Sequence, residues 1–170
     1  IMPFADDAGL FVIADSAQGF GGEINGRKTG TFGLVTATSF FPAKPLGCYG
    51  DGGALFTDDE ELATYMRSIR VHGQGASKYD CVRVGINGRL DTIQAAILIE
   101  KLKIFPGEIK SRQIVADNYS HAFSGLVAVP AVAPGRTSVW AQYTLRLTSR
   151  IRDELSLWLS ELGIPTQIYY

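Results

Sequence analysis

The stretch FVIADSAQ, residues 11–18, joins a short apolar run to the carboxylate of Asp15. Four consecutive apolar residues followed by a polar one are typical of a buried strand in a parallel sheet. In open α/β sheets, ligands bind at the carboxyl ends of such strands. These residues therefore predict a strand that brings Asp15 to a binding edge, with Gln18 in the same loop. A turn-forming or helix-capping role for Asp15 is the alternative interpretation.

Two later segments have the same pattern. Residues 34–41 and 54–57 predict further strands, and loops rich in Gly and Pro lie next to both. Ser39 lies near the end of the first, and Lys44 follows it in FPAKPLG, residues 41–47. Because this lysine lies between two prolines among apolar residues, we expect partial removal from water, which favours the neutral, nucleophilic amine that a Schiff base requires. An ordinary lysine of a surface loop is the alternative.

The remaining pattern predicts helices and a few more strands. The chain would begin with the last turns of a helix. Further helices are expected over residues 59–70, 91–105, 108–123 and 151–162, with strands over 138–147 and from Gln167 onward. The chain stops within a strand-like run, TQIYY (residues 166–170), which indicates a piece of a longer protein.

Composition excludes several classes of protein. The chain has 170 residues, of which 46% are hydrophobic and 19% charged, so it is neither disordered nor a coiled coil. A net charge of −1 argues against a nucleic-acid partner, and no apolar run is long enough to span a membrane. Cys48 and Cys81 do not form a disulfide framework, which favours a reduced, cytoplasmic location. Neither they nor His72 and His121 have the spacing of a metal site, so we expect no metal.

Loop motifs give weaker signals. Asn87-Gly88-Arg89 precedes an expected helix, where Asn and Arg side chains can bind phosphate. A turn signal followed by a solvated arginine is an equally good interpretation. The glycine-rich GDGG, residues 50–53, matches neither phosphate-loop nor dinucleotide-binding spacing, and no GxSxG nucleophile elbow is present.

The three polar groups near the strand ends are more informative together. Asp15, Ser39 and Lys44 offer a carboxylate, a hydroxyl and an amine on one edge of one expected sheet. Pyridoxal 5'-phosphate requires those three groups: a carboxylate on its ring nitrogen, a hydroxyl on its phosphate and a lysine on its aldehyde. The set predicts a site for that cofactor.

In these motifs the chain resembles the DegT/DnrJ/StrS family of sugar aminotransferases, a branch of the fold-type-I pyridoxal-phosphate enzymes. The matching stretches run in the family's order: VIADSAQ (12–18), SFFPAKPLG (39–47), GDGGA (50–54), His72-Gly73 and GINGRLDTIQAA (85–96). The resemblance implies an α/β fold, comprising part of a large domain with a mixed, mostly parallel sheet and part of a smaller α+β domain. It places the carboxyl-terminal half of the cofactor-binding domain at residues 1–90, bridging helices at 91–125 and the start of the small domain at 126–170.

The resemblance also implies roles for individual residues. Lys44 would be the Schiff-base lysine and proton shuttle, and Asp15 would pair with the ring nitrogen. Gln18 would lie beside the cofactor ring, and Ser39 would bind the phosphate. Asn87 would reach the phosphate of a neighbouring subunit's cofactor, which implies a homodimer with shared sites.

Further implications concern substrate and length. Arg89 would contact substrate or the partner's site. The expected reaction moves an amino group from glutamate, or a similar amino-acid donor, to a keto group of a nucleotide-linked sugar, for polysaccharide or related amino-sugar synthesis. Family members have additional segments on both sides of the matched region. A dehydratase or epimerase of the same family, or an incomplete fragment without catalysis, are the alternatives; Lys44 argues against the dehydratases, which carry histidine there.

Overall fold

The computed structural model describes residues 1–168 and contains two compact units. The first comprises residues 1–114 and 132–141, and the second comprises residues 115–131 with those from 142 onward. The domain boundaries expected near residues 90 and 125 remain a prediction. Tyr169 and Tyr170 lie outside the described residues, and no strand is formed at residues 167–168, where the last one was expected to begin.

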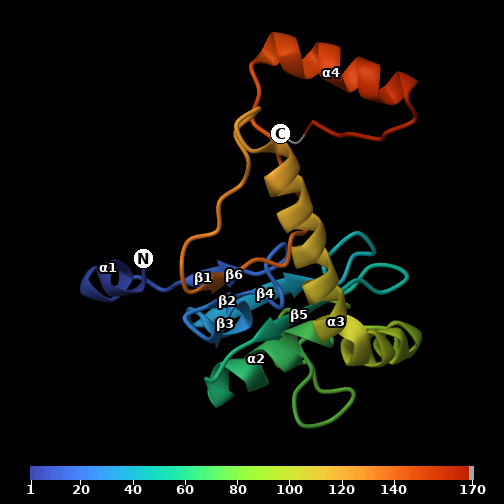
Figure 1. The fold of residues 1–170 in the computed structure, drawn as a ribbon. Coiled ribbons are helices and arrows are strands. Elements are labelled where there is room, and N and C mark those ends of the chain that lie inside the picture. Colours follow the sequence, from blue (N-terminus) through green and yellow to red (C-terminus); the bar gives the residue numbers. More distant parts are fainter. Residues whose placement is uncertain (169–170) are drawn as a thin grey trace. The chain divides into compact units, whose positions relative to one another are not determined.

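The first unit contains a mixed sheet with the order β1-β4-β5 (Figure 1). Its strands are β1 (Ile13–Asp15), β4 (Val35–Ser39) and β5 (Gly53–Phe56). β1 and β4 are parallel, whereas β4 and β5 are antiparallel. The three strands expected from the apolar runs are therefore confirmed, and so is the mixed sheet.

The expected burial of β1 is wrong. Ile13 exposes 73% of its surface, and only β4 pairs with β1 among the described residues. An apolar run gives no information on whether both faces and both edges of a strand are covered within the same segment of chain.

A second small sheet was missed by sequence reasoning, which predicted only a loop there. Its strands β2 (Glu23–Ile24), β3 (Arg27–Lys28) and β6 (Arg136–Thr137) are antiparallel, in the order β3-β2-β6. Asn25 and Gly26 connect β2 to β3 with positive φ angles of 51° and 77°. An Asn-Gly pair is a strong hairpin signal, so the sequence did contain it. A short 3-10 helix, η1 (Thr29–Thr31), follows β3.

Two helices of the first unit agree with their sequence signals. α1 (Met2–Asp7) opens the chain, and α2 (Glu60–Arg70) follows β5. The carboxylate of Asp59 accepts a hydrogen bond of 2.9 Å from the backbone N–H of Leu62, which caps the first turn of α2. Acidic residues in the first turn and arginines in the last complement the helix dipole.

The longest element is a single helix, α3 (Thr92–Phe123), where two helices were expected on either side of Pro106. An interior proline removes one backbone hydrogen bond and costs about 3 kcal/mol. Phe105 and Ile109 flank the proline, and both pack against the same core cluster. We attribute the continuity of α3 to this packing. Among the described residues, no helix is long and apolar enough to cross a membrane.

The strand expected over residues 138–147 is also wrong. The chain passes through a left-handed conformation at Trp140, with φ 48°, which interrupts any extended run. Only an isolated bridge joins Ala128 to Arg146 in this region. The expected burial of alternate apolar side chains was correct in part, because Val139 is buried.

The second unit contains the expected helix near the end of the chain, α4 (Ser149–Glu161).

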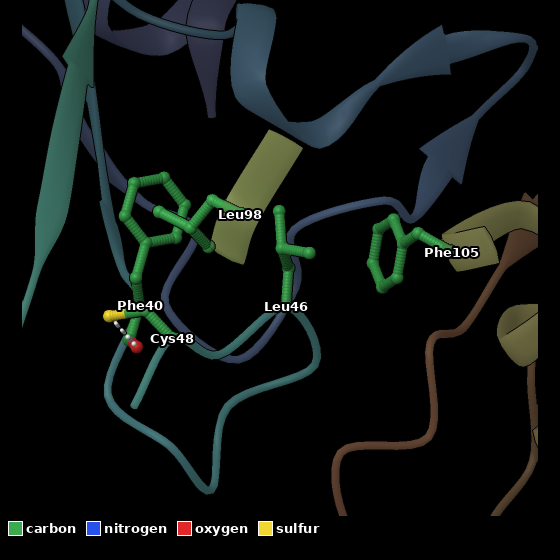
Figure 2. Close-up of a cluster of buried hydrophobic side chains, with 5 residues drawn as sticks. All are labelled: Phe40, Leu46, Cys48, Leu98 and Phe105. Atoms are coloured by element: carbon green, nitrogen blue, oxygen red, sulfur yellow. Dashed lines mark hydrogen bonds between the residues drawn. The ribbon is translucent and has the colours of Figure 1, made fainter. Parts of the chain in front are cut away.

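The core of the first unit lies between the loop after β4 and α3. Its buried members are Phe40, Leu46, Cys48, Leu98 and Phe105, and Figure 2 shows these side chains. The first three come from the loop that contains Lys44, and the other two come from the helix. This core therefore fixes the loop to α3.

Candidate functional site

Strand pairing brings Asp15 and Ser39 to the same edge and the same face of the sheet. Asp15 is in register with Ala37 on the parallel neighbour, and Ser39 lies two residues farther along that strand. Because side chains alternate along a strand, Ala37 and Ser39 project to one face, and the partner of Ala37 projects with them. The expected convergence of these two residues at the carboxyl ends of β1 and β4 is confirmed at the level of the backbone.

The loop after β1 holds its shape through hydroxyl groups. Oδ1 of Asp15 accepts a hydrogen bond of 2.9 Å from the N–H of Ala17, which fixes the carboxylate at the turn. The buried Ser16 donates to Oγ1 of Thr29, and Thr29 donates to the carbonyl of Gly19 at 2.7 Å. Gln18 is exposed within this loop. These contacts orient the carboxylate and leave the side chain of Gln18 accessible.

Ser39 is fixed by its own turn. Its Oγ accepts a hydrogen bond of 3.2 Å from the N–H of Phe41. A hydroxyl that accepts in this way still has its own hydrogen to donate, and the structure gives that hydrogen no acceptor among the described residues. Ser39 therefore fits an anion such as phosphate.

Lys44 lies in a closed loop immediately beyond Ser39. The N–H of Cys48 donates to the carbonyl of Phe40 at 2.8 Å, and the N–H of Lys44 donates to the carbonyl of Phe41 at 2.8 Å. Leu46 and Cys48 expose 2% and 1% of their surfaces, so the far side of the loop is anchored in the core (Figure 2).

The amine of Lys44 makes no hydrogen bond or ion pair within residues 1–168, and the residue is half-buried. Half-burial of the residue is compatible with the expected partial removal of the amine from water, which stays a prediction. An unpaired amine on a firmly anchored loop is suited to covalent chemistry rather than to a structural ion pair.

Asn87 and Arg89 pair with each other. The Nε–H of Arg89 donates to Oδ1 of Asn87 at 2.9 Å, and both side chains are exposed. Asn87 also forms an isolated bridge with Val71. No hydrogen bond of the described residues joins this pair to Asp15, Ser39 or Lys44. With its oxygen engaged by Arg89, the amide of Asn87 presents its N–H donors.

A hollow on the other face of the sheet is distinct from this site. Thr36 and Thr38 contribute to its lining, together with residues of β5 and α2. These threonines alternate with Ala37 and Ser39 along β4, so they project to the opposite face of the sheet. None of the sequence-predicted site residues lines the hollow.

Sequence reasoning missed the residues of α3 that hold the Lys44 loop. The side-chain oxygen of Gln94 accepts from the N–H of Tyr49 at 2.8 Å, and Arg112 donates to the carbonyl of Pro45. Neither contact has a local signal in the sequence, because the partners are 45 and 67 residues apart. Helical periodicity places such residues on a face, but it does not identify the loop that they meet.

Comparison with known proteins supports one family. The sequence profile of the DegT/DnrJ/EryC1/StrS aminotransferase family matches residues 1–170. The chain is 46% identical to UDP-2-acetamido-2-deoxy-3-oxo-D-glucuronate aminotransferase from Pseudomonas aeruginosa, and the match covers 100% of this chain and 47% of that protein. It is 40% identical to dTDP-3-amino-3,4,6-trideoxy-alpha-D-glucose transaminase from Streptomyces venezuelae, and this match covers 98% of this chain and 44% of that protein.

Solved structures support the same fold. A DegT DnrJ EryC1 StrS aminotransferase from Brucella abortus superposes with a TM-score of 0.95 and 51% identity, covering 99% of this chain and 45% of that one. The fold is thus part of the fold-type-I architecture, as expected. The chain spans about half the length of the curated relatives it matches.

Proposed function

Because the chain belongs to the DegT/DnrJ/EryC1/StrS aminotransferase family, we propose that it is the lysine-bearing part of an enzyme that aminates a nucleotide-linked sugar. Enzymes of this family depend on pyridoxal 5'-phosphate. The observation that carries the proposal is the placement of Lys44. Its amine lies on an anchored loop that begins at the sheet edge where Asp15 and Ser39 share a face.

The residues present fit the cofactor. Asp15 offers a carboxylate for the ring nitrogen, and its orientation is fixed by Ala17. Ser39 has a hydroxyl hydrogen to donate to phosphate, and Gln18 is accessible for a contact beside the ring. The amine of Lys44 is available for the aldehyde, because it has no competing partner among the described residues.

The chemistry then divides between the bound group and the chain. When bound, the cofactor supplies an electron sink for the carbanion at the substrate carbon. Asp15 would hold the proton on the ring nitrogen by placing negative charge beside it, which would keep that sink effective. Nζ of Lys44 would move the proton between the substrate carbon and the cofactor carbon, acting as general base and then as general acid.

The names of the relatives support a nucleotide-linked sugar as the substrate class. One is named for a UDP-linked keto sugar acid and another for a dTDP-linked amino deoxy sugar, so the nucleotide and the sugar both differ, while a sugar linked to a nucleotide is common to the two names. We propose a keto group on such a sugar as the acceptor and glutamate, or a similar amino acid, as the donor. The role that fits is amino-sugar supply for a polysaccharide or a related product in the cytoplasm, where free thiols such as Cys48 and Cys81 persist.

The site would be shared between two copies of the full-length protein. Asn87, whose oxygen is engaged by Arg89, presents amide donors at an exposed position. Such donors suit the phosphate of a cofactor held by a second copy. The guanidinium of Arg89 retains further N–H groups for a substrate anion.

The test is the absorbance spectrum of the full-length protein with pyridoxal 5'-phosphate. We expect a visible band from the lysine-bound cofactor, which Lys44→Ala abolishes and which the exposed control Lys110→Ala leaves intact. Adding glutamate should discharge the band and form 2-oxoglutarate, and a keto-sugar nucleotide should then restore it with an amino sugar as product. A wild-type protein that folds but shows no such band contradicts the proposal. Loss of water from the sugar without amine transfer would indicate the dehydratase alternative.

A further inference from the structure

Arg112 of α3 donates hydrogen bonds to the backbone of the loop that contains Lys44. Nη1 and Nη2 of Arg112 each lie 3.2 Å from the carbonyl oxygen of Pro45, the residue that follows Lys44. Arg112 is half-buried and Pro45 is buried. A carbonyl removed from water requires a donor, and a charged donor forms the stronger hydrogen bond.

This contact is made to the residue directly after Lys44. Leu46 and Cys48 anchor its returning half in the core, and Gln94 holds the N–H of Tyr49 just beyond it. Residues 41–44 are held by two local hydrogen bonds, from the N–H of Lys44 to the carbonyl of Phe41 and from the N–H of Phe41 to Oγ of Ser39. Arg112 is therefore the contact from α3 nearest to Lys44 along the chain.

From this geometry we infer that Arg112 is a positioning residue for the amine of Lys44, an inference that rests on the proposed function. The ring of Pro45 fixes its own φ angle, so holding its carbonyl also restricts the peptide that joins it to Lys44. The amine then stays where it can attack. In that step, Nζ bonds to the aldehyde carbon of the cofactor and one molecule of water leaves.

Loss of the Arg112 contact should slow the covalent reaction of Lys44 with the cofactor, with a smaller effect on the stability of the fold. A reacting group that is not held in one position has a lower effective concentration. A displacement of about 1 Å can lower the reaction rate up to roughly a hundredfold. For Arg112→Met we expect covalent capture to be slowed about tenfold or more. Arg112→Lys keeps the charge but not the paired donors, so it should recover part of the rate.

The experiment measures covalent capture in the full-length apoprotein. Pyridoxal 5'-phosphate is added, the visible band is followed in time, and samples are reduced with borohydride so that mass spectrometry counts modified Lys44 peptide. Lys110→Met is the matched control, because it removes an exposed cation from the same helix and should behave as wild type. Thermal unfolding of each apoprotein is recorded alongside.

The readouts separate positioning from stability. A purely structural defect lowers the fraction of folded protein, and therefore the amplitude of capture, but the remaining folded molecules react at the wild-type rate. Capture at the wild-type rate by folded Arg112→Met overturns the inference and leaves the proposed function standing. If that variant does not fold, an unchanged rate in Arg112→Lys overturns it equally. Absence of capture in the wild type refutes the proposed function itself.

Discussion

Gly47 shows how tightly the Lys44 loop is built at the scale of one residue. A Cβ added there would lie 2.6 Å from the carbonyl oxygen of Pro42 and 2.7 Å from that of Phe41. Both atoms belong to the backbone, so the loop would have to move. We expect Gly47→Ala to lower the free energy of unfolding of the full-length protein by about 1–3 kcal/mol, measured by urea denaturation.

The matched control is Gly107→Ala. Gly107 lies within α3, and an added Cβ there has no neighbour within 4 Å. Because Ala is the better helix former, this change should stabilise by up to about 1 kcal/mol. Equal unfolding midpoints for the two variants would contradict the close packing that we describe around Gly47.

At the residue scale, the backbone positions of Asp15 and Ser39 at the ends of β1 and β4 were predicted correctly, whereas the roles of the site residues stay predictions. Asp15, Ser39 and Lys44 follow strand-like runs, so their type and their position both pointed to a strand edge. The positioning residue Arg112 could not be found, because a lone arginine on a helix resembles any solvated cation. Its partner, the carbonyl of Pro45, is a backbone atom that no sequence pattern displays.

At the scale of elements, α3 is the support on which the site is built. Leu98 of α3 is buried against the loop residues Phe40, Leu46 and Cys48 (Figure 2). Truncation with Leu98→Ala should lower the free energy of unfolding by about 2–5 kcal/mol. Leu98→Met keeps the volume and should lose less than about 1.5 kcal/mol.

Both variants of Leu98 can be compared by denaturant unfolding of the full-length protein. The alanine variant should also capture cofactor less completely, because the loop loses its anchor. If the alanine and methionine variants unfold at the same denaturant concentration, the cluster does not stabilise the fold as we infer.

Element prediction failed where packing outweighs a local rule. Pro106 predicted a break, but the contacts of Phe105 and Ile109 on either side keep α3 continuous. Alternation predicted a strand over residues 138–147, but Trp140 adopts a left-handed backbone that no apolar pattern reveals. The capped helix α2 was predicted well, because its start and stop signals are local.

At the scale of the whole molecule, the proposed sharing of sites can be tested by mixing two defective copies. Co-expression of Lys44→Ala with Asn87→Ala yields mixed dimers in which one site combines an intact lysine with an intact asparagine. If each site draws these residues from different subunits, random pairing restores about a quarter of the sites. The transaminase activity of the mixture is compared with the activity of each variant alone. The difference measures the fraction of sites that have both an intact lysine and an intact asparagine.

The same mixture gives no activity if Lys44 and Asn87 serve one site within one chain, since every site then carries a defect. A double variant of one copy, co-expressed with wild type, is the control for dimer exchange. The chain spans 44–47% of these two curated relatives, so the experiment is designed for the full-length protein.

Burial of Cys48 has one more consequence. Its sulfur lies 3.1 Å from the carbonyl oxygen of Phe40 in the interior, whereas Cys81 is exposed. An alkylating reagent should meet the second thiol at once and the first only during transient opening of the core. The labelling rate of Cys48 therefore reports how often the core that supports the Lys44 loop opens transiently to solvent.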